Sequence, residues 1–131
     1  MTRQPRRTKM SRIEGGVRLL LDYKDALDRR DVDGLLALLT DDCRFESHTP
    51  APDGATFSGK QAIGDYWREF FAACTDFRAE GEDVFAIGFH CVMRWTRTWT
   101  EVDGRERRLR GVDVFKIREG LIEEVLEYGK G

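Results

Sequence analysis

The hydrophobic and polar positions change their period near the middle of the chain. Before residue 74 the apolar side chains recur three or four positions apart, the spacing of one helix face. One stripe runs from Val17 to Leu27, and Asp31 is a candidate N-cap for a short helix reaching Leu39. Ser58 and Gln61 form a capping box, which predicts a third helix. The apolar side of that helix holds Ile63, Trp67, Phe70, Phe71 and Cys74.

Beyond residue 76 the apolar positions alternate with period two, which is typical of strands. The pattern and its turn residues predict strands over residues 77–87, 90–102, 105–118 and 121–129. A further short strand, residues 43–49, ends at a loop over 50–57 that contains Pro50 and Pro52. Helices followed by an antiparallel meander predict an α+β domain in which helices cover one face of a curved sheet.

A carboxylate interrupts one of the apolar strand faces. Asp113 shares its face with Leu109, Gly111, Phe115 and Ile117. Removing an ionised carboxyl from water is costly unless a partner or a raised pKa compensates. Asp113 is therefore predicted to hold an ion pair or to take part in chemistry.

The turn Asp103-Gly104 predicts the register of the strands on either side of it. A two-residue loop would place Arg94 opposite Asp113 and Thr96 opposite Gly111. The same register sends a second set of apolar residues to the opposite face, where we expect them to form a homodimer interface. This set is Met93, Trp95, Val112 and Val114.

Other polar residues are candidates for the same inner face. Tyr23 can reach it from the first helix, and the short strand offers either Glu46 and His48 or Ser47. A three-residue loop ending at Gly120 would turn Glu127 towards Asp113, whereas a two-residue loop would turn it away. With an arginine and a histidine, such acids form an acid–base constellation.

Composition narrows the functional classes. A net charge of −2 gives no general case for nucleic-acid binding, and no run of residues is long enough to cross a membrane. We expect a basic, flexible leader over residues 1–12 and one domain over residues 13–131. Cys43, Cys74 and Cys91 lack metal-ligand spacing, so we predict no metal site and a reducing cytoplasmic location.

The order of elements resembles the nuclear transport factor 2-like superfamily, particularly its SnoaL-like polyketide cyclases. The resemblance is carried by residues 21–35, by Ser58-Gly59-Lys60-Gln61-Ala62-Ile63, and by residues 111–122. It implies a cone-shaped, cystatin-like fold in which a bent sheet encloses helices and leaves a pocket at the open end. It also implies a homodimer packed through the outer sheet face.

Two relatives imply roles for individual residues. In ketosteroid isomerase, which is also a standard example of a protonated pocket acid, a tyrosine and an aspartic acid stabilise the oxyanion. Tyr23 and Asp113 look like their matches, whereas Ser47 stands at the position of the base. Limonene epoxide hydrolase activates water with an arginine and two aspartates. Arg94 and Glu127 look like matches to the arginine and one acid, and Thr96 replaces the other.

These observations lead to one expectation and two alternatives. We expect a small apolar, polyketide-like or steroid-like molecule in the cone and proton transfer without a cofactor, as in an isomerase or cyclase. The catalytic candidates are Asp113, Tyr23, His48 and Glu46, and the substrate-binding candidates are Arg94, Trp67, Thr96, Glu127 and Phe115. The alternatives are a non-catalytic ligand-binding or dimerisation module and epoxide-hydrolase-like addition of water.

Overall fold

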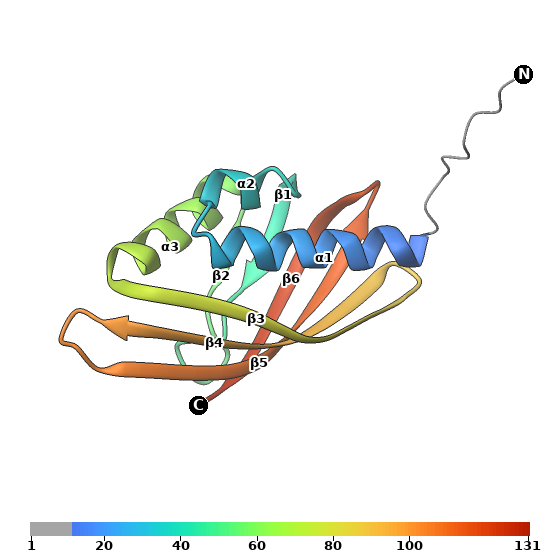
Figure 1. Ribbon diagram of the computed structural model, residues 1–131. Helices are drawn as coiled ribbons and strands as arrows, with labels where there is room; N and C mark the ends of the chain where they lie inside the picture. Colours follow the sequence, from blue (N-terminus) through green and yellow to red (C-terminus); the bar gives the residue numbers. More distant parts are fainter. Residues whose placement is uncertain (1–11) are drawn as a thin grey trace, which may run out of the picture.

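A computed structural model describes residues 12–131, in which helices lie over one face of a six-stranded sheet (Figure 1). The helices are α1 (Arg12–Asp28), α2 (Val32–Leu36) and α3 (Lys60–Ala72). The strands are β1 (Leu39–Glu46), β2 (Thr56–Ser58), β3 (Cys74–Ile87), β4 (His90–Glu101), β5 (Glu106–Arg118) and β6 (Leu121–Lys130). Residues 1–11 of the predicted leader lie outside the described part of the chain.

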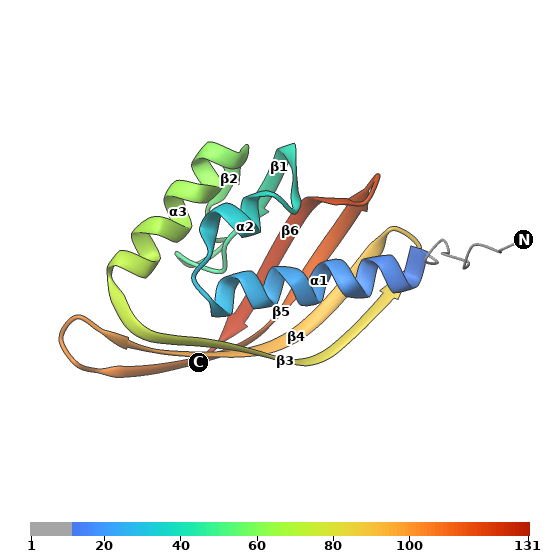
Figure 2. The same cartoon turned by 45° about the horizontal axis from the view of Figure 1, so that its top comes forward.

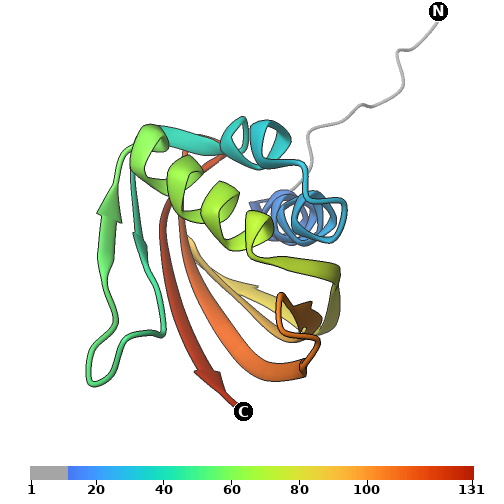
Figure 3. The same cartoon turned by 90° about the vertical axis from the view of Figure 1, so that its left-hand side faces the viewer.

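The sheet is bent around the helices, as the two rotated views show (Figures 2 and 3). Its strand order is β2-β1-β6-β5-β4-β3, and every neighbouring pair is antiparallel except β1 and β6, which run parallel. Breaks in register occur in the β1–β6, β3–β4 and β5–β6 pairs. Such bulges increase the local twist and bend a sheet. The predicted α+β cone is therefore confirmed.

The concave face of the sheet and the helices above it enclose the core. Leu20, Tyr23 and Leu27 of the predicted α1 stripe are buried. Trp67 of α3 is also buried, within a chain of ring contacts that joins α3 to the sheet. The members of this chain are Phe45, Phe57, Tyr66, Trp67, Phe70, Phe71, Phe77 and Trp99.

Some predicted element ends are wrong. Helix α3 has no side-chain cap hydrogen bond; its N-cap is Gly59, while Ser58 belongs to β2 and pairs with Arg44. Gly59 has a φ of 88°, a conformation that glycine adopts at little steric cost. Cys74 begins β3 rather than extending α3. The predicted loop over residues 50–57 is too long, because β2, a strand of three residues, begins at Thr56.

The predicted register of β4 and β5 is wrong by one residue. The loop contains three residues, because Glu101 pairs with Arg105 through a 2.8 Å hydrogen bond from its N–H to the Arg105 carbonyl. Gly104 takes the left-handed position, with φ 89°. A slip of one residue sends every affected side chain to the other face. Met93, rather than Arg94, therefore lies opposite Asp113.

This slip corrects the expected positions of four residues. Arg94 and Thr96 lie on the convex face, where both contact Glu82. Met93 and Trp95, expected at a homodimer interface, are each 2% exposed within the core. Val112 and Val114 do lie on the convex face, in register with Arg94 and Val92 respectively.

The β5–β6 hairpin reaches the expected arrangement by a different route. Arg118 pairs with Leu121, so the loop has two residues, Glu119 and Gly120, both with positive φ. A two-residue loop alone would turn Glu127 away from Asp113. The register shifts between Lys116 and Ile117, however, and Glu127 pairs with Asp113 after all.

Candidate functional site

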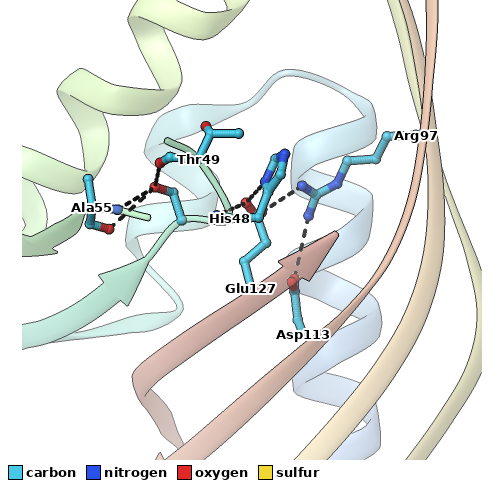
Figure 4. A network of polar contacts seen from close by, with 7 residues as sticks. His48, Thr49, Ala55, Arg97, Asp113 and Glu127 are labelled. Atoms are coloured by element: carbon cyan, nitrogen blue, oxygen red, sulfur yellow. Dashed lines mark hydrogen bonds and ion pairs between the residues drawn. The ribbon is translucent and has the colours of Figure 1, made fainter. Parts of the chain in front are cut away.

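Two carboxyls and one guanidinium meet on the concave face of the sheet. Asp113 of β5 and Glu127 of β6 are register partners, and they are 1% and 3% exposed. Arg97 reaches both from β4 and is 4% exposed (Figure 4). Its Nη1 donates a 2.7 Å hydrogen bond to Glu127 Oε2, and its Nη2 donates a 3.4 Å bond to Asp113 Oδ2. The short bond makes Glu127 the closer partner of the arginine.

Two tryptophans hold the Arg97 guanidinium. Its central carbon lies 3.7 Å from the centre of the Trp95 ring and 5.5 Å from that of Trp67. An arginine close to the face of an indole gains a cation–π attraction, which is larger away from water. Strand alternation places Trp95 and Arg97 on one face, while Trp67 approaches from α3. The arginine is therefore fixed by stacking as well as by its ion pairs.

His48 extends the network to the edge of the concave face. It lies two residues beyond the end of β1, and its Nδ1 is 2.7 Å from Glu127 Oε1, which also accepts a 3.2 Å hydrogen bond from the His48 backbone N–H. The ring lies over Gly129 of β6, where a Cβ would stand 3.2 Å from two ring carbons. We assign the Nδ1 proton to the bond with Glu127, which leaves Nε2 as an acceptor in the neutral ring.

The two carboxyls have opposite shifts in pKa. Burial raises the pKa of Asp113, and the negative charge of Glu127 adds to this, whereas Arg97 opposes it; the balance is well above the ordinary value. Burial alone would also raise the pKa of Glu127. The positive charge of Arg97 and the hydrogen bond from His48 lower it by more, so the net shift of the pKa is downwards. Glu127 is thus the permanent anion of the pair, and Asp113 is the acid that can hold a proton near neutrality.

Several buried polar atoms around Arg97 have no hydrogen-bond partner. Within residues 12–131 these atoms are Arg97 Nε, Asp113 Oδ1 and the indole nitrogens of Trp67 and Trp95. The Trp95 indole favours the ionised form of Asp113, although the two groups lie outside hydrogen-bond geometry. Unpaired buried polar atoms are uncommon in folded proteins and call for an explanation. Their concentration around one arginine marks this as the chemically unusual part of the molecule.

A cavity of about 290 Å³ opens beside the network, at the small end of the range for ligand pockets. Arg97 and His48 line it, together with aromatic side chains of α3 and β4. A separate space of about 10 Å³ lies where Tyr23, Asp113 and Trp95 meet Arg97. Arg97 lines both spaces, whereas Asp113 lines only the smaller one, so a ligand in the larger cavity meets Arg97 and His48 but not Asp113.

The remaining predicted residues fall into two groups. Tyr23 is buried edge-on against Phe115, with ring centres 5.1 Å apart, and burial raises the pKa of its hydroxyl well above the ordinary value. Phe115 is a core residue. Trp67 both packs in the core and lines the cavity. Glu46 pairs in register with Leu126 of β6, on the convex side, away from His48 and Glu127.

Arg97 is the residue that the sequence reasoning missed. It continues the alternation of Cys91, Met93, Trp95 and Trp99, all on one face of β4. A charge inside an apolar alternation is the same signal that identified Asp113. The wrong register assigned the arginine's role to Arg94 instead.

No group of three or more His, Cys, Asp or Glu side chains among residues 12–131 is arranged to hold a metal ion. No helix in that part of the chain is long and apolar enough to span a bilayer. What the cavity does present is an imidazole held by a carboxylate and a guanidinium beside it.

Comparisons with known proteins identify the family. The sequence matches the SnoaL-like domain over residues 20–125, and the chain belongs to this family. A comparison with curated proteins found no match. A nuclear transport factor 2-like protein of unknown function from Mesorhizobium loti has a similar structure, with 28% identity and a TM-score of 0.75 over 95% of this chain and 98% of that one.

Two further solved structures share the fold at lower identity. A candidate polyketide cyclase from Xanthomonas campestris has 21% identity and a TM-score of 0.76, covering 90% of this chain and 92% of its own. A protein with a ketosteroid isomerase-like fold from Catenulispora acidiphila, in complex with trimethylamine, has 14% identity and a TM-score of 0.77. That alignment covers 84% of this chain and 83% of the other. The predicted resemblance to this superfamily is thus confirmed.

Proposed function

We propose that this protein binds a small, largely apolar molecule in the 290 Å³ cavity and moves a proton to or from one of its carbon atoms, without a cofactor. The reaction class is isomerisation or aldol-type cyclisation, in which a base removes a proton next to a carbonyl group. The observation that carries this proposal is the 2.7 Å contact between His48 Nδ1 and Glu127 at the cavity wall.

His48 is the proposed base. A general base must stand within hydrogen-bond reach of the proton that it removes, and His48 is a cavity-lining residue with an imidazole nitrogen left free by the Glu127 bond. A buried carboxylate at the other ring nitrogen fixes the tautomer and stabilises the imidazolium that forms, as in hydrolase triads. Arg97 keeps Glu127 ionised and in place.

Arg97 is the proposed electrostatic partner of the reaction. Removing a proton next to a carbonyl places negative charge on the oxygen, and a fixed cation in a dry site stabilises that charge. Tyr23 and Asp113, first expected in this role, face the 10 Å³ space behind Arg97 rather than the larger cavity. In our proposal a protonated Asp113 leaves more of the positive charge of Arg97 available to the substrate.

The test uses 5-nitrobenzisoxazole, an aromatic carbon acid that opens to a coloured phenolate when a base removes its ring proton. We expect turnover above the buffer rate, and a loss of about 10² to 10⁴-fold in His48→Gln, the usual contribution of a general base. His90→Gln is the matched control, since His90 stands at the far end of β4 and is exposed. Equal rates for His48→Gln and the wild type would refute the role of His48. Binding without turnover would make the protein a non-catalytic ligand carrier.

Addition of water to an epoxide is a second candidate, and one observation favours it. Arg97 joins two buried carboxyls, an acid–arginine–acid arrangement like the one that the resemblance to limonene epoxide hydrolase implies. Styrene oxide is the discriminating probe. If its hydrolysis depends on Asp113 but not on His48, water addition is the better description of the activity.

The convex face supports a proposed homodimer, with a changed set of residues. Phe85, Val92, Val114 and Leu126 are register partners along one row across four strands. Phe85 is 49% exposed and the other three side chains are half-buried, so a second copy of the chain would cover an apolar row that one copy leaves in contact with water. We also propose the cytoplasm as the location, because the free thiols of Cys43, Cys74 and Cys91 are the state that a reducing compartment maintains.

A further inference from the structure

The walls of the cavity favour a planar, aromatic ligand. Tyr66, Trp67 and Phe70 line it from α3, and Trp99 lines it from β4. Trp99 meets Phe70 edge-on with ring centres 5.3 Å apart, so the two sides of the cavity are already joined by aromatic packing. Aromatic side chains contribute large apolar contact areas and favour offset or edge contacts with another ring.

The outer end of the cavity carries an arginine that is not fully engaged. Arg107 is the register partner of Trp99, so its side chain lies on the concave face of β5. It lines the cavity, and its side chain is 44% exposed. Its contact with an acid is long, 3.5 Å from Nη1 to Glu101 Oε2. An arginine prefers close, paired contacts with a carboxylate, and this contact is not one of them.

Glu101 has several partners and cannot satisfy Arg107 alone. Arg105 lies 3.5 Å from its Oε1, and the Trp99 indole N–H donates a 3.5 Å hydrogen bond to its Oε2. The other residues that line this rim with an ionisable side chain are basic, Arg108 and Lys130. Among the lining residues of the cavity, all within the described part of the chain, Glu101 is the sole carboxylate side chain.

We propose that the ligand is an aromatic compound with an anionic group, a carboxylate or a phenolate, and that Arg107 binds this group at the outer end of the cavity. This inference rests on the proposed function, because it names the class of molecule whose other end would meet His48 and Arg97. The 290 Å³ volume limits the ligand to about two fused rings. Arg107 determines specificity and takes no part in proton transfer.

Binding of two matched probes tests the proposal. 2-Naphthoate and 2-naphthamide have nearly the same shape but differ in charge, and tryptophan fluorescence reports their binding. Because the Arg107 side chain is 44% exposed, solvent screens its charge, and the acid should bind roughly fivefold more tightly than the amide. Arg107→Gln should bring the two dissociation constants within about twofold, whereas Glu101→Gln should widen the difference by freeing Arg107.

Arg110→Gln is the control for charge alone. Arg110 also belongs to β5 and its side chain is also 44% exposed, but it pairs in register with Thr96 on the convex face, contacts Glu82 there and does not line the cavity. It should keep the preference for the acid. Gly131 also lines the rim, so the comparison is repeated with a chain extended by Gly-Ser-Gly, which moves any terminal carboxylate away. The preference should be at least as large there.

The outcomes separate this inference from the proposed function. Equal binding of acid and amide by the wild type, or the same loss of preference in Arg110→Gln as in Arg107→Gln, would overturn the inference even if 5-nitrobenzisoxazole is turned over. Conversely, an Arg107-dependent preference in a protein that fails to open 5-nitrobenzisoxazole would keep the anion site and reject the catalytic role of His48.

Discussion

Replacing Asp113 with Asn should stabilise the protein in a pH-dependent way. The pKa of Asp113 is raised from 3.8 to about 7, first by burial and then by the negative charge of Glu127, against the opposing effect of Arg97. The unfolded chain therefore releases this proton near pH 4, whereas the folded protein keeps it until near pH 7. Over that interval the unfolded state binds fewer protons, so the free energy of unfolding falls as the pH rises.

The size of the effect follows from the shift. A shift of about 3 pKa units at about 1.4 kcal/mol each gives an upper value of about 4 kcal/mol, and coupling to Glu127 and Arg97 reduces it towards about 2 kcal/mol. An asparagine side chain cannot ionise, so the Asp113→Asn variant avoids this loss. The stability difference, variant minus wild type, should thus grow by about 2 to 3 kcal/mol between pH 4.5 and pH 8, because part of the loss already occurs below pH 4.5.

Urea unfolding followed by tryptophan fluorescence at several pH values measures this difference. Asp53→Asn, in the exposed loop before β2, is the matched control and should show no such growth. A difference that stays constant from pH 4.5 to pH 8 would mean that Asp113 is already ionised at low pH. A difference that shrinks with rising pH would show that the ionised carboxyl stabilises the fold, and the assignment of the two carboxyls would be reversed.

Further predictions concern the partner carboxyl, the packing of α1 and the convex face. Glu127→Gln should lower the free energy of unfolding by about 3 kcal/mol at pH 7, because it breaks a buried ion pair. This loss of stability should stay nearly constant down to pH 4.5, since the pKa of Glu127 is lowered to about 2. In urea unfolding, Gly15→Ala should stabilise α1 by about 0.5 to 1 kcal/mol, because a Cβ there meets nothing within 4 Å. Gly16→Ala should cost about 1 to 3 kcal/mol, because its Cβ would stand 2.6 Å from Cys91 Sγ. Val114→Glu should shift the proposed dimer to monomer in sedimentation velocity with the fold intact, and an unchanged mass would argue against the convex interface.

The fold and the buried acid could be predicted from the sequence because both depend on periodicity. The change from helical to period-two spacing separates the helices from the long strands, and alternation alone places Asp113 among apolar neighbours. Neither inference depends on loop length. The alternation of β4 places Arg97 among apolar neighbours in the same way. This signal could have identified Arg97 as the buried partner of Asp113 and Glu127.

Register could not be predicted in the same way. Asp-Gly serves both two-residue loops and three-residue loops in which Gly takes the left-handed position, and the two differ by one residue in pairing. Here Gly104 is the third loop residue, so Arg94 leaves the site. The bulge that returns Glu127 to Asp113 has no residue signature, because Glu123 and its neighbours are ordinary strand residues. Such errors decide which side chains meet without changing the fold.

The cost of the buried charges argues that they serve the cavity rather than the fold. Arg97, Asp113 and Glu127 are each less than 5% exposed, and a buried ion pair often stabilises a protein no more than apolar side chains of similar volume. A triple variant, Arg97→Met, Asp113→Leu and Glu127→Leu, should therefore unfold at no lower urea concentration than the wild type, while Arg97→Met alone should lose about 3 to 5 kcal/mol by leaving a carboxylate unpaired. If the triple variant is as unstable as the single one, the network holds the cone together. If it is stable yet fails to open 5-nitrobenzisoxazole, the charges are retained for their effect on His48 and on the bound molecule.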